Sequence, residues 1–335
     1  MVVEELLLKE TILSVQSLKK YFPIQRTFIE NLVKKETQYV RAVDDVTFNI
    51  DRGEVFGLAG ESGSGKTTIG RLILRLAEPT AGKILFNGVD LESLQGEEFR
   101  RFRRKMQVIF QDPYASLNPR MKIGDAIGHP LEIHNIAKNR EEKDRVLAMM
   151  ERVGLSPATA LYDKYPHQLS GGQRQRVAIA RALILQPEFV VADEPIAMVD
   201  VSMRAMILEL MMELKKDLGL TYLFITHDLA TAKYVCNRIA IMYLGKIVES
   251  GPLQEVFSNP QHPYTEALLS AVPIPDPKAD RKKLIPKGEI PNPINPPSGC
   301  RFHPRCPYAM SICSKDEPQL QETEKGHYVA CYRSA

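Results

Sequence analysis

A glycine-rich stretch directly after a short apolar segment is the feature that most restricts how this chain can fold. Residues 54–60 read EVFGLAG and continue into GESGSGKTT, which fits the phosphate-binding pattern GxxxxGK[ST]. The pattern needs a strand before the loop and a helix after it, because the loop N–H groups and the positive end of the helix dipole must face phosphate oxygens. The residues predicted to line this loop are Gly60, Glu61, Ser62, Gly63, Ser64, Gly65, Lys66, Thr67 and Thr68.

Two acidic residues at the end of another apolar segment supply the carboxylates that such a loop requires. The segment FVVADEP places Asp193 and Glu194 where a strand would end. Lys66 is expected to contact the β- and γ-phosphates, whereas Thr67 and Asp193 would bind Mg²⁺. Glu194 would act as the general base toward the attacking water. The sequence therefore predicts a site for a nucleoside triphosphate and Mg²⁺.

Strand-like and helix-like segments alternate along most of the chain. Apolar, strand-like runs lie at residues 12–22, 40–50, 54–60, 82–91, 189–195, 221–228 and 238–245, and helical spacing at 141–155 and 201–219. This alternation predicts an α/β domain with a largely parallel sheet. The charged segment 23–38 is interpreted as an insertion between two strands, and the basic segment 96–107 as the solvated face of a helix.

Composition and charge exclude several classes of protein. The 335 residues are 25% charged with a net charge of +3, which lacks the basic excess of a dedicated nucleic-acid binder, so no nucleic-acid partner is expected. Residues 1–10 do not resemble a signal peptide, and no apolar run approaches the ~18 residues that span a bilayer. We expect a protein that is soluble or reaches a membrane only through a partner.

Residues 169–183, LSGGQRQRVAIARAL, are similar to the signature of ATP-binding cassette (ABC) ATPases. Ser170 precedes Asp193 by 23 residues, as that family requires. The resemblance covers essentially the whole chain. It implies an α/β fold of the P-loop NTPase type, in which a RecA-like parallel sheet core carries an antiparallel β subdomain and an α-helical subdomain, followed by an irregular C-terminal extension.

The same resemblance assigns further residues to the nucleotide site. Gln111 in VIFQDPY resembles the Q-loop and would join the Mg²⁺ site, and His227 in FITHD resembles the H-loop switch. Phe22 is expected to stack on adenine, with Tyr21 as the alternative. Since the family pairs two domains head to tail, each domain would also cap the ATP of its partner, through Ser170, Gly171, Gly172, Gln173 and Asp200.

One segment departs from the family pattern. The D-loop commonly reads Ser-Ala-Leu-Asp, whereas residues 197–200 read Ala-Met-Val-Asp, so the bond that a hydroxyl at Ala197 would make across the dimer is in doubt. The catalytic set is intact: Lys66, Gln111, Glu194 and His227. The sequence therefore predicts an active ATPase in preference to a non-hydrolysing regulatory module.

Several stretches resemble the ATPases of oligopeptide and dipeptide importers, among them QDPYASLNPRMKIGDAI and NPPSGCRFHPRCPYAMSIC. The implied partners are membrane permease subunits, a sister ATPase or a second copy of this chain, and indirectly an extracellular or periplasmic solute-binding protein. The implied location is peripheral, on the cytoplasmic face of the cell membrane. Oligosaccharide or nickel as cargo, and a soluble ABC ATPase outside transport, stay open as alternatives; a heterodimer is expected over a homodimer.

Four cysteines gather near the C-terminal end with the spacing C-x5-C-x6-C-x17-C: Cys300, Cys306, Cys313 and Cys331. Without a secretory signal, clustered thiols suggest a metal site in preference to disulfides. The tight C-x2–4-C pair of structural zinc sites is absent. The importer resemblance implies a 4Fe-4S cluster; Zn²⁺, with His303 replacing one thiol, and unligated thiols are the alternatives. Cys236 is expected to be a buried core thiol.

A change of composition near residue 272 predicts the domain division. Residues 1–271 would form the nucleotide-binding domain, with its helical subdomain at about 115–185, and residues 272–335 a proline-rich linker and the cysteine-containing extension. The extension has too few apolar residues for a core of its own, so a bound cluster would stabilise it. Loss of the cluster is expected to loosen residues 290–335 and to leave ATP binding largely intact.

Overall fold

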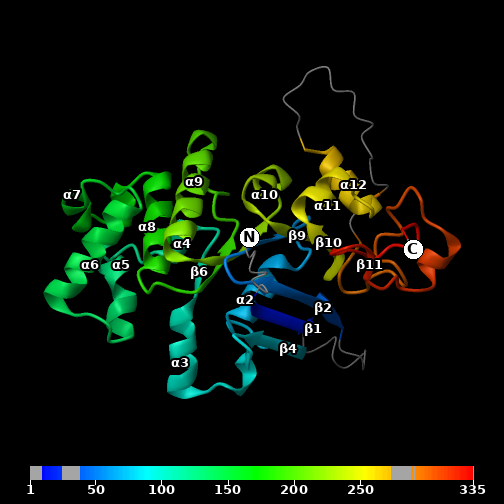
Figure 1. The fold of residues 1–335 in the computed structure, drawn as a ribbon, viewed down its shortest axis with the longest axis horizontal. Coiled ribbons are helices and arrows are strands. Elements are labelled where there is room, and N and C mark those ends of the chain that lie inside the picture. The colour runs from blue at the N-terminus through cyan, green and yellow to red at the C-terminus, as the bar shows by residue number, and fades with distance from the viewer. Residues whose placement is uncertain (1–9, 25–37, 273–287, 290, 335) are drawn as a thin grey trace, which may run out of the picture. The chain divides into compact units, whose positions relative to one another are not determined.

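A computed structural model describes residues 10–24, 38–272, 288–289 and 291–334. Most of the predicted insertion at 23–38 and the start of the proline-rich linker lie outside these ranges. The chain divides into two compact units, which we describe one at a time (Figure 1). The first comprises Met1–Glu10, Asp51–Val55 and Glu92–Phe224; the second comprises Thr11–Ile50, Phe56–Leu91 and Ile225–Ala335.

The first unit contains strands in the order β8-β7-β6, with bounds Thr221–Thr226, Phe189–Asp193 and Met106–Ile109. Strands β6 and β7 are parallel. Every residue of β7 is buried, as expected for a parallel strand that is covered on both faces. Helix α3, Gly96–Lys105, carries the basic run and buries none of its residues, which confirms that this run is a solvated helix face.

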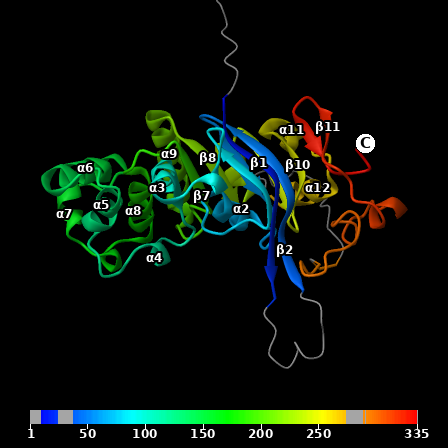
Figure 2. The ribbon, with the colours of Figure 1, turned by 90° about the horizontal axis from the view of Figure 1, so that it is seen from below.

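Five helices of the first unit lie together in both views: α4 (Pro113–Ser116), α5 (Ile123–Ile133), α6 (Asn139–Arg152), α7 (Ala158–Tyr162) and α8 (Gly171–Leu183) (Figures 1 and 2). Helix α5 packs against α6, α7 and α8. Helix α6 buries Val146, Met149 and Met150, so the helical spacing predicted at 141–155 is confirmed. Helix α9, Val201–Leu218, follows β7 and ends at Gly219, whose φ is 64°.

The second unit contains an antiparallel sheet in the order β2-β1-β4-β5, with bounds Tyr39–Asp51, Thr11–Pro23, Ala81–Phe86 and Val89–Asp90. Its second group of strands runs β11-β12-β10-β9-β3, with bounds Gln321–Glu324, His327–Val329, Lys246–Pro252, Arg238–Tyr243 and Val55–Ala59. Strands β3 and β9 are parallel, whereas β10 pairs with β9 in the antiparallel sense.

Four helices accompany the strands of the second unit: α2 (Lys66–Ile73), α10 (Leu229–Val235), α11 (Leu253–Ser258) and α12 (Pro263–Ser270). Cys236 follows α10 and is buried, and a Cβ on Gly57 of β3 would lie 2.8 Å from its Sγ. The prediction of a core thiol is therefore confirmed. Over the described ranges of the chain, none of the helices has both the length and the apolar character to cross a membrane.

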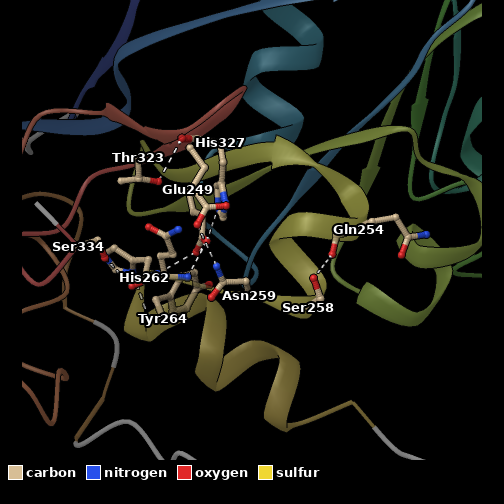
Figure 3. Close-up of polar contacts among 11 residues, drawn as sticks. Glu249, Gln254, Ser258, Asn259, His262, Tyr264, Thr323, His327 and Ser334 are labelled. Atoms are coloured by element: carbon tan, nitrogen blue, oxygen red, sulfur yellow. Dashed lines mark hydrogen bonds and ion pairs between the residues drawn. The ribbon is translucent and has the colours of Figure 1, made fainter.

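Strand pairing and a buried carboxylate hold the C-terminal extension within the second unit. Strand β12 pairs with β10, which places Glu249 opposite Val329. The fully buried Glu249 carboxylate accepts hydrogen bonds from the N–H groups of Gln261 (2.8 Å) and His262 (3.0 Å). It also accepts one from His327 Nε2 (2.8 Å) (Figure 3). The extension was expected to be irregular; its hairpin β11–β12 was not predicted.

Candidate active site

The phosphate-binding loop predicted at residues 60–68 lies between β3 and α2, as the pattern requires. Two of its glycines adopt backbone conformations that a side chain would not allow. Gly60 has φ 150°, and a Cβ there would lie 2.2 Å from the carbonyl oxygen of Met242. Gly65 has φ 108°, and its Cβ would lie 2.1 Å from the carbonyl oxygen of Ala42. Only glycine fits at these positions, so the loop is held tightly against β2 and β9.

The loop binds its own lysine through several oxygens. Lys66 begins α2 and is buried. Its Nζ donates to the carbonyl oxygens of Gly60 (2.8 Å) and Glu61 (2.9 Å), and to Ser64 Oγ (3.3 Å). The ammonium is thereby fixed at the N-terminus of a helix, where backbone N–H groups and the helix dipole favour phosphate.

The two aromatic candidates for adenine stacking differ in their surroundings. The Tyr21 hydroxyl donates to Asp44 in a short hydrogen bond. Burial, this bond and the Asp44 charge raise the pKa of Tyr21 to about 12. Phe22, the next residue of β1, is 40% exposed and lies under the Lys20 ammonium, 5.0 Å from its ring centroid. An exposed ring at a strand end is available for stacking, which favours Phe22 over the anchored Tyr21.

His227 follows β8 and is exposed in the second unit. The next residue, Asp228, caps helix α10 by accepting a hydrogen bond from the N–H of Ala230 (2.9 Å). Its carboxylate also accepts one from Thr231 Oγ1 (2.7 Å). The sequence THD thus ends a strand and starts a helix, which holds the backbone of His227 in a defined position.

The carboxylates of the first unit lie at the end of β7, where the sequence placed them. Asp193 is buried as the last residue of the strand. Glu194 has φ 46°, a left-handed conformation that costs a non-glycine residue on the order of 1 kcal/mol and is common at functional sites. Gln111 Nε2 donates to Glu194 Oε2 at 2.8 Å. The structure therefore brings together the predicted Q-loop residue and the predicted base.

The signature segment opens helix α8 of the same unit. Ser170 is the N-cap: its Oγ accepts from the N–H of Gln173 (3.2 Å), and its own N–H donates to Gln173 Oε1 (3.0 Å). This reciprocal pair is a capping box, and it uses the Ser170 N–H. Gly171 and Gly172 occupy the first turn of the helix, where anions are favoured.

The D-loop of the first unit lies beside the signature. A Cβ on Gly171 would lie 3.8 Å from the carbonyl oxygen of Met198, and one on Gly172 would lie 3.1 Å from Met203 Cε. Asp200 is the exposed N-cap of α9, and no side-chain capping bond is recorded for it. The signature segment thus lies close to the D-loop and to the start of α9.

The four C-terminal cysteines line one small cavity of about 20 Å³ in the second unit. Each sulfur accepts a backbone N–H; the donors are Phe302 for Cys300, Tyr308 for Cys306, Met310 for Cys313 and Arg333 for Cys331. Burial raises the pKa of the Cys300 thiol to about 11 and also raises the pKa of Cys306 and Cys331. Any metal ligation must therefore displace protons.

The cysteines of this cavity are not arranged as a metal site. Across the ranges that the structure describes, no three or more His, Cys, Asp or Glu side chains are grouped so that they could hold a metal ion. The His303 ring, the alternative zinc ligand, has its Nδ1 2.9 Å from the carbonyl oxygen of Cys300. Ligation of a 4Fe-4S cluster or of Zn²⁺ by these four cysteines therefore stays a prediction.

Sequence reasoning missed two arginines between the first two cysteines. Arg301 pairs with Asp44 and donates to the carbonyl oxygen of Leu244 through short contacts. Arg305 pairs with Glu61 in the phosphate-binding loop. The partners of both arginines lie more than 50 residues away in sequence. Neither arginine belongs to a motif, and the available signal was their position in the segment CRFHPRC.

Comparison with known proteins decides the family. A family model described as ABC transporter matches residues 43–197, and one described as oligopeptide/dipeptide transporter, C-terminal region, matches residues 248–313. A putative peptide import ATP-binding protein of Brucella ovis is 49% identical over 322 residues, which cover 96% of this chain and 98% of that protein. The chain belongs to the ABC transporter family of ATP-binding proteins.

Other relatives of this ABC ATPase agree with that assignment. The oligopeptide transport ATP-binding protein AppF of Bacillus subtilis is 46% identical over 327 residues, with 97% of this chain and 98% of that protein covered. The structure titled as a dimeric post-hydrolysis state of the ATP-binding cassette MJ0796 with ADP and Pi matches with a TM-score of 0.62 and 29% identity, over 72% of this chain and 98% of that one.

These matches confirm the predicted P-loop ABC ATPase fold and the predicted ATPase activity. ATP and Mg²⁺ are the expected cofactors of this ABC ATPase. The family descriptions and relatives' names mention no iron–sulfur cluster and no zinc.

Proposed function

We propose that this ABC ATPase hydrolyses ATP to drive the import of oligopeptides or dipeptides. The observation that carries the proposal is the match of residues 248–313 to the C-terminal region of oligopeptide/dipeptide transporters, in a chain that also has the ABC cassette. Relatives that are 46% and 49% identical over nearly the full length are named for oligopeptide transport and peptide import. Oligosaccharide and nickel uptake stay as alternatives for the cargo.

The proposed mechanism uses two protomers head to tail. Lys66 and the loop N–H groups bind the β- and γ-phosphates, Thr67 and Asp193 bind Mg²⁺, and Phe22 stacks on adenine. The signature helix of the partner caps the γ-phosphate through Ser170, Gly171, Gly172 and Gln173, and Asp200 lies beside it. Because two such sites close together, ATP joins the protomers and hydrolysis separates them.

The contact between Gln111 and Glu194 suggests how hydrolysis is controlled. The Gln111 amide donates to Glu194 Oε2, so this oxygen is engaged with Gln111 where the proposed mechanism needs it to contact water. Nucleotide binding that draws Gln111 away would release Glu194 to act as general base, with His227 at the γ-phosphate. Arrival of ATP and activation of the base would then be linked through one hydrogen bond.

The proposed partners are two membrane permease subunits, a second ATPase (a sister chain or another copy) and, indirectly, a solute-binding protein outside the cell. The location would be peripheral, on the cytoplasmic face of the membrane. We expect the chain to sediment with membranes only when the permeases are co-expressed, and its ATPase rate in vesicles to rise with peptide and binding protein. Permease-independent sedimentation, or stimulation by nickel or an oligosaccharide and not by peptide, would contradict the proposal.

We further propose that the four cysteines bind a 4Fe-4S cluster, with Zn²⁺ as the alternative. The cavity that all four thiols line supports this, as do the backbone N–H groups that face each sulfur, because such bonds stabilise cluster sulfur. The thiols would have to turn toward a common centre. When bound, the cluster would supply folding free energy to the extension.

Metal analysis of the Cys306→Ser variant tests this assignment. We expect anaerobically purified wild-type chain to contain about four iron and four sulfide per chain, and Cys306→Ser to lose most of both. Residues 291–334 should then become sensitive to protease. Cys236→Ala, which removes the core thiol outside the cavity, is the matched control and should keep its iron. One zinc per chain, or equal metal in both variants, would contradict the cluster.

A further inference from the structure

The C-terminal extension contacts the phosphate-binding loop through Arg305. The Arg305 guanidinium donates two hydrogen bonds to the Glu61 carboxylate, Nη1–Oε2 at 2.9 Å and Nη2–Oε1 at 3.3 Å. This paired geometry is the strong form of an arginine–carboxylate interaction. The side chain of Arg305 is only 10% exposed and that of Glu61 is 28% exposed, so solvent screens the pair less than it would at the surface.

Glu61 is also fixed through its backbone. Its N–H donates to the hydroxyl of the buried Tyr264 at 2.9 Å. Its carbonyl oxygen accepts from Lys66 Nζ at 2.9 Å and from the N–H of Ser64 at 3.2 Å. One residue therefore connects Arg305 of the extension to the lysine that is expected to bind phosphate.

The negative charge of Glu61 affects how well the loop can bind an anionic ligand. Glu61 places a carboxylate in a loop that must bind a triphosphate, and an unpaired negative charge there would repel it. Arg305 neutralises that charge. The guanidinium of an arginine is charged at every physiological pH, so this neutralisation does not depend on conditions.

We propose that Arg305 is a positioning residue of the nucleotide site, which holds Glu61 and neutralises it so that the phosphate-binding loop accepts ATP. The inference rests on the proposed nucleotide role of residues 60–68. It replaces the expectation that loosening the extension leaves ATP binding intact, because Arg305 lies between Cys300 and Cys306.

Other contacts keep the extension in place when Arg305 is changed. Phe302 is buried in an aromatic cluster, with ring centroids 5.3 Å from Tyr243 and 5.4 Å from Tyr264. Arg301 pairs with Asp44, and β12 pairs with β10. A variant at Arg305 should therefore keep its fold while it loses the pair with Glu61 and the weaker contacts with the Tyr243 hydroxyl and with the Tyr243 and Phe302 rings.

The test compares ATP affinity in purified full-length variants, with a fluorescent ATP analogue as the probe. We expect Arg305→Gln to raise the Kd about tenfold, the effect of losing one charge-assisted contact, with little change in kcat. Arg305→Lys should recover part of the affinity, because lysine restores the positive charge but cannot donate two parallel hydrogen bonds to the carboxylate as a guanidinium does. Arg305→Gln combined with Glu61→Gln should bind ATP nearly as wild type, since the uncompensated charge is gone.

Arg333→Gln is the matched control. Arg333 also lies in the extension, two residues after Cys331, but it pairs with Glu266 on the surface. We expect its ATP affinity and its protease pattern to equal those of wild type. Equal ATP affinity in Arg305→Gln and Arg333→Gln, or no rescue by Glu61→Gln, would overturn the inference. Failure of the wild-type chain to bind ATP would instead overturn the proposed function.

Discussion

Replacement of Glu194 by Gln is expected to lower ATP turnover about a thousandfold while ATP binding persists. The amide keeps the size of the side chain and can still accept the hydrogen bond from Gln111, but it cannot take a proton from water. ATP would then accumulate unhydrolysed between two protomers. The measurements are phosphate release, nucleotide affinity, and the dimer fraction by size-exclusion chromatography with ATP and Mg²⁺.

Glu209→Gln serves as the control for this change. Glu209 is an exposed residue of α9 in the same unit, so the variant loses the same charge away from the predicted site. It should hydrolyse ATP at the wild-type rate. Wild-type turnover in Glu194→Gln would remove Glu194 from the role of base, and weak ATP binding in that variant would assign it to nucleotide binding instead.

Replacement of Glu249 by Gln is expected to lower the free energy of unfolding by about 3 kcal/mol. Three donors converge on this fully buried carboxylate, and an amide offers one acceptor oxygen in place of two. Burial lowers the pKa of His262 to about 4, so its imidazole is neutral and its Nδ1 already accepts the N–H of Tyr264 (3.0 Å). Urea unfolding of the full chain measures the change.

The control for Glu249 lies in the same region of the second unit. Glu324 in β11 is exposed and its Oε1 is 3.4 Å from Asn259 Nδ2 (Figure 3 shows Asn259). Glu324→Gln should change the free energy of unfolding by less than about 0.5 kcal/mol. We also expect protease to cut the extension in Glu249→Gln and not in Glu324→Gln. Equal stability of the two variants would show that Glu249 does not hold the extension.

The features that could be predicted from sequence are those that are determined by residues close together in the chain. The phosphate-binding loop needs glycine at Gly60 and Gly65 because of backbone that lies within a few ångströms, and the pattern of nine consecutive residues expresses that need. Helix α8 begins at Ser170 because Ser170 and Gln173 cap each other three residues apart. In both cases the signal lies within a short stretch of the sequence, so the pattern can be recognised without the structure.

Strand β10 shows why other elements were missed. Its residues KIVESGP include a charge, a hydroxyl, a glycine and a proline in succession. A sequence of this kind, considered without the rest of the chain, is typical of a turn. The strand forms because donors from Gln261, His262 and His327 satisfy Glu249. Two of these donors follow Glu249 by 12 and 13 residues and the third by 78, so a short stretch of sequence around the strand does not contain them.

The pairing of Arg305 with Glu61 also bears on how the protein is made. The two residues are 244 positions apart, and a chain grows at about 5–20 residues per second, so Arg305 is added roughly 10–50 s after Glu61. During that interval the acidic side chain of Glu61 lacks its counter-charge. On the proposed role of Arg305, the nascent cassette would bind ATP more weakly until Arg305 has been synthesised and has paired with Glu61.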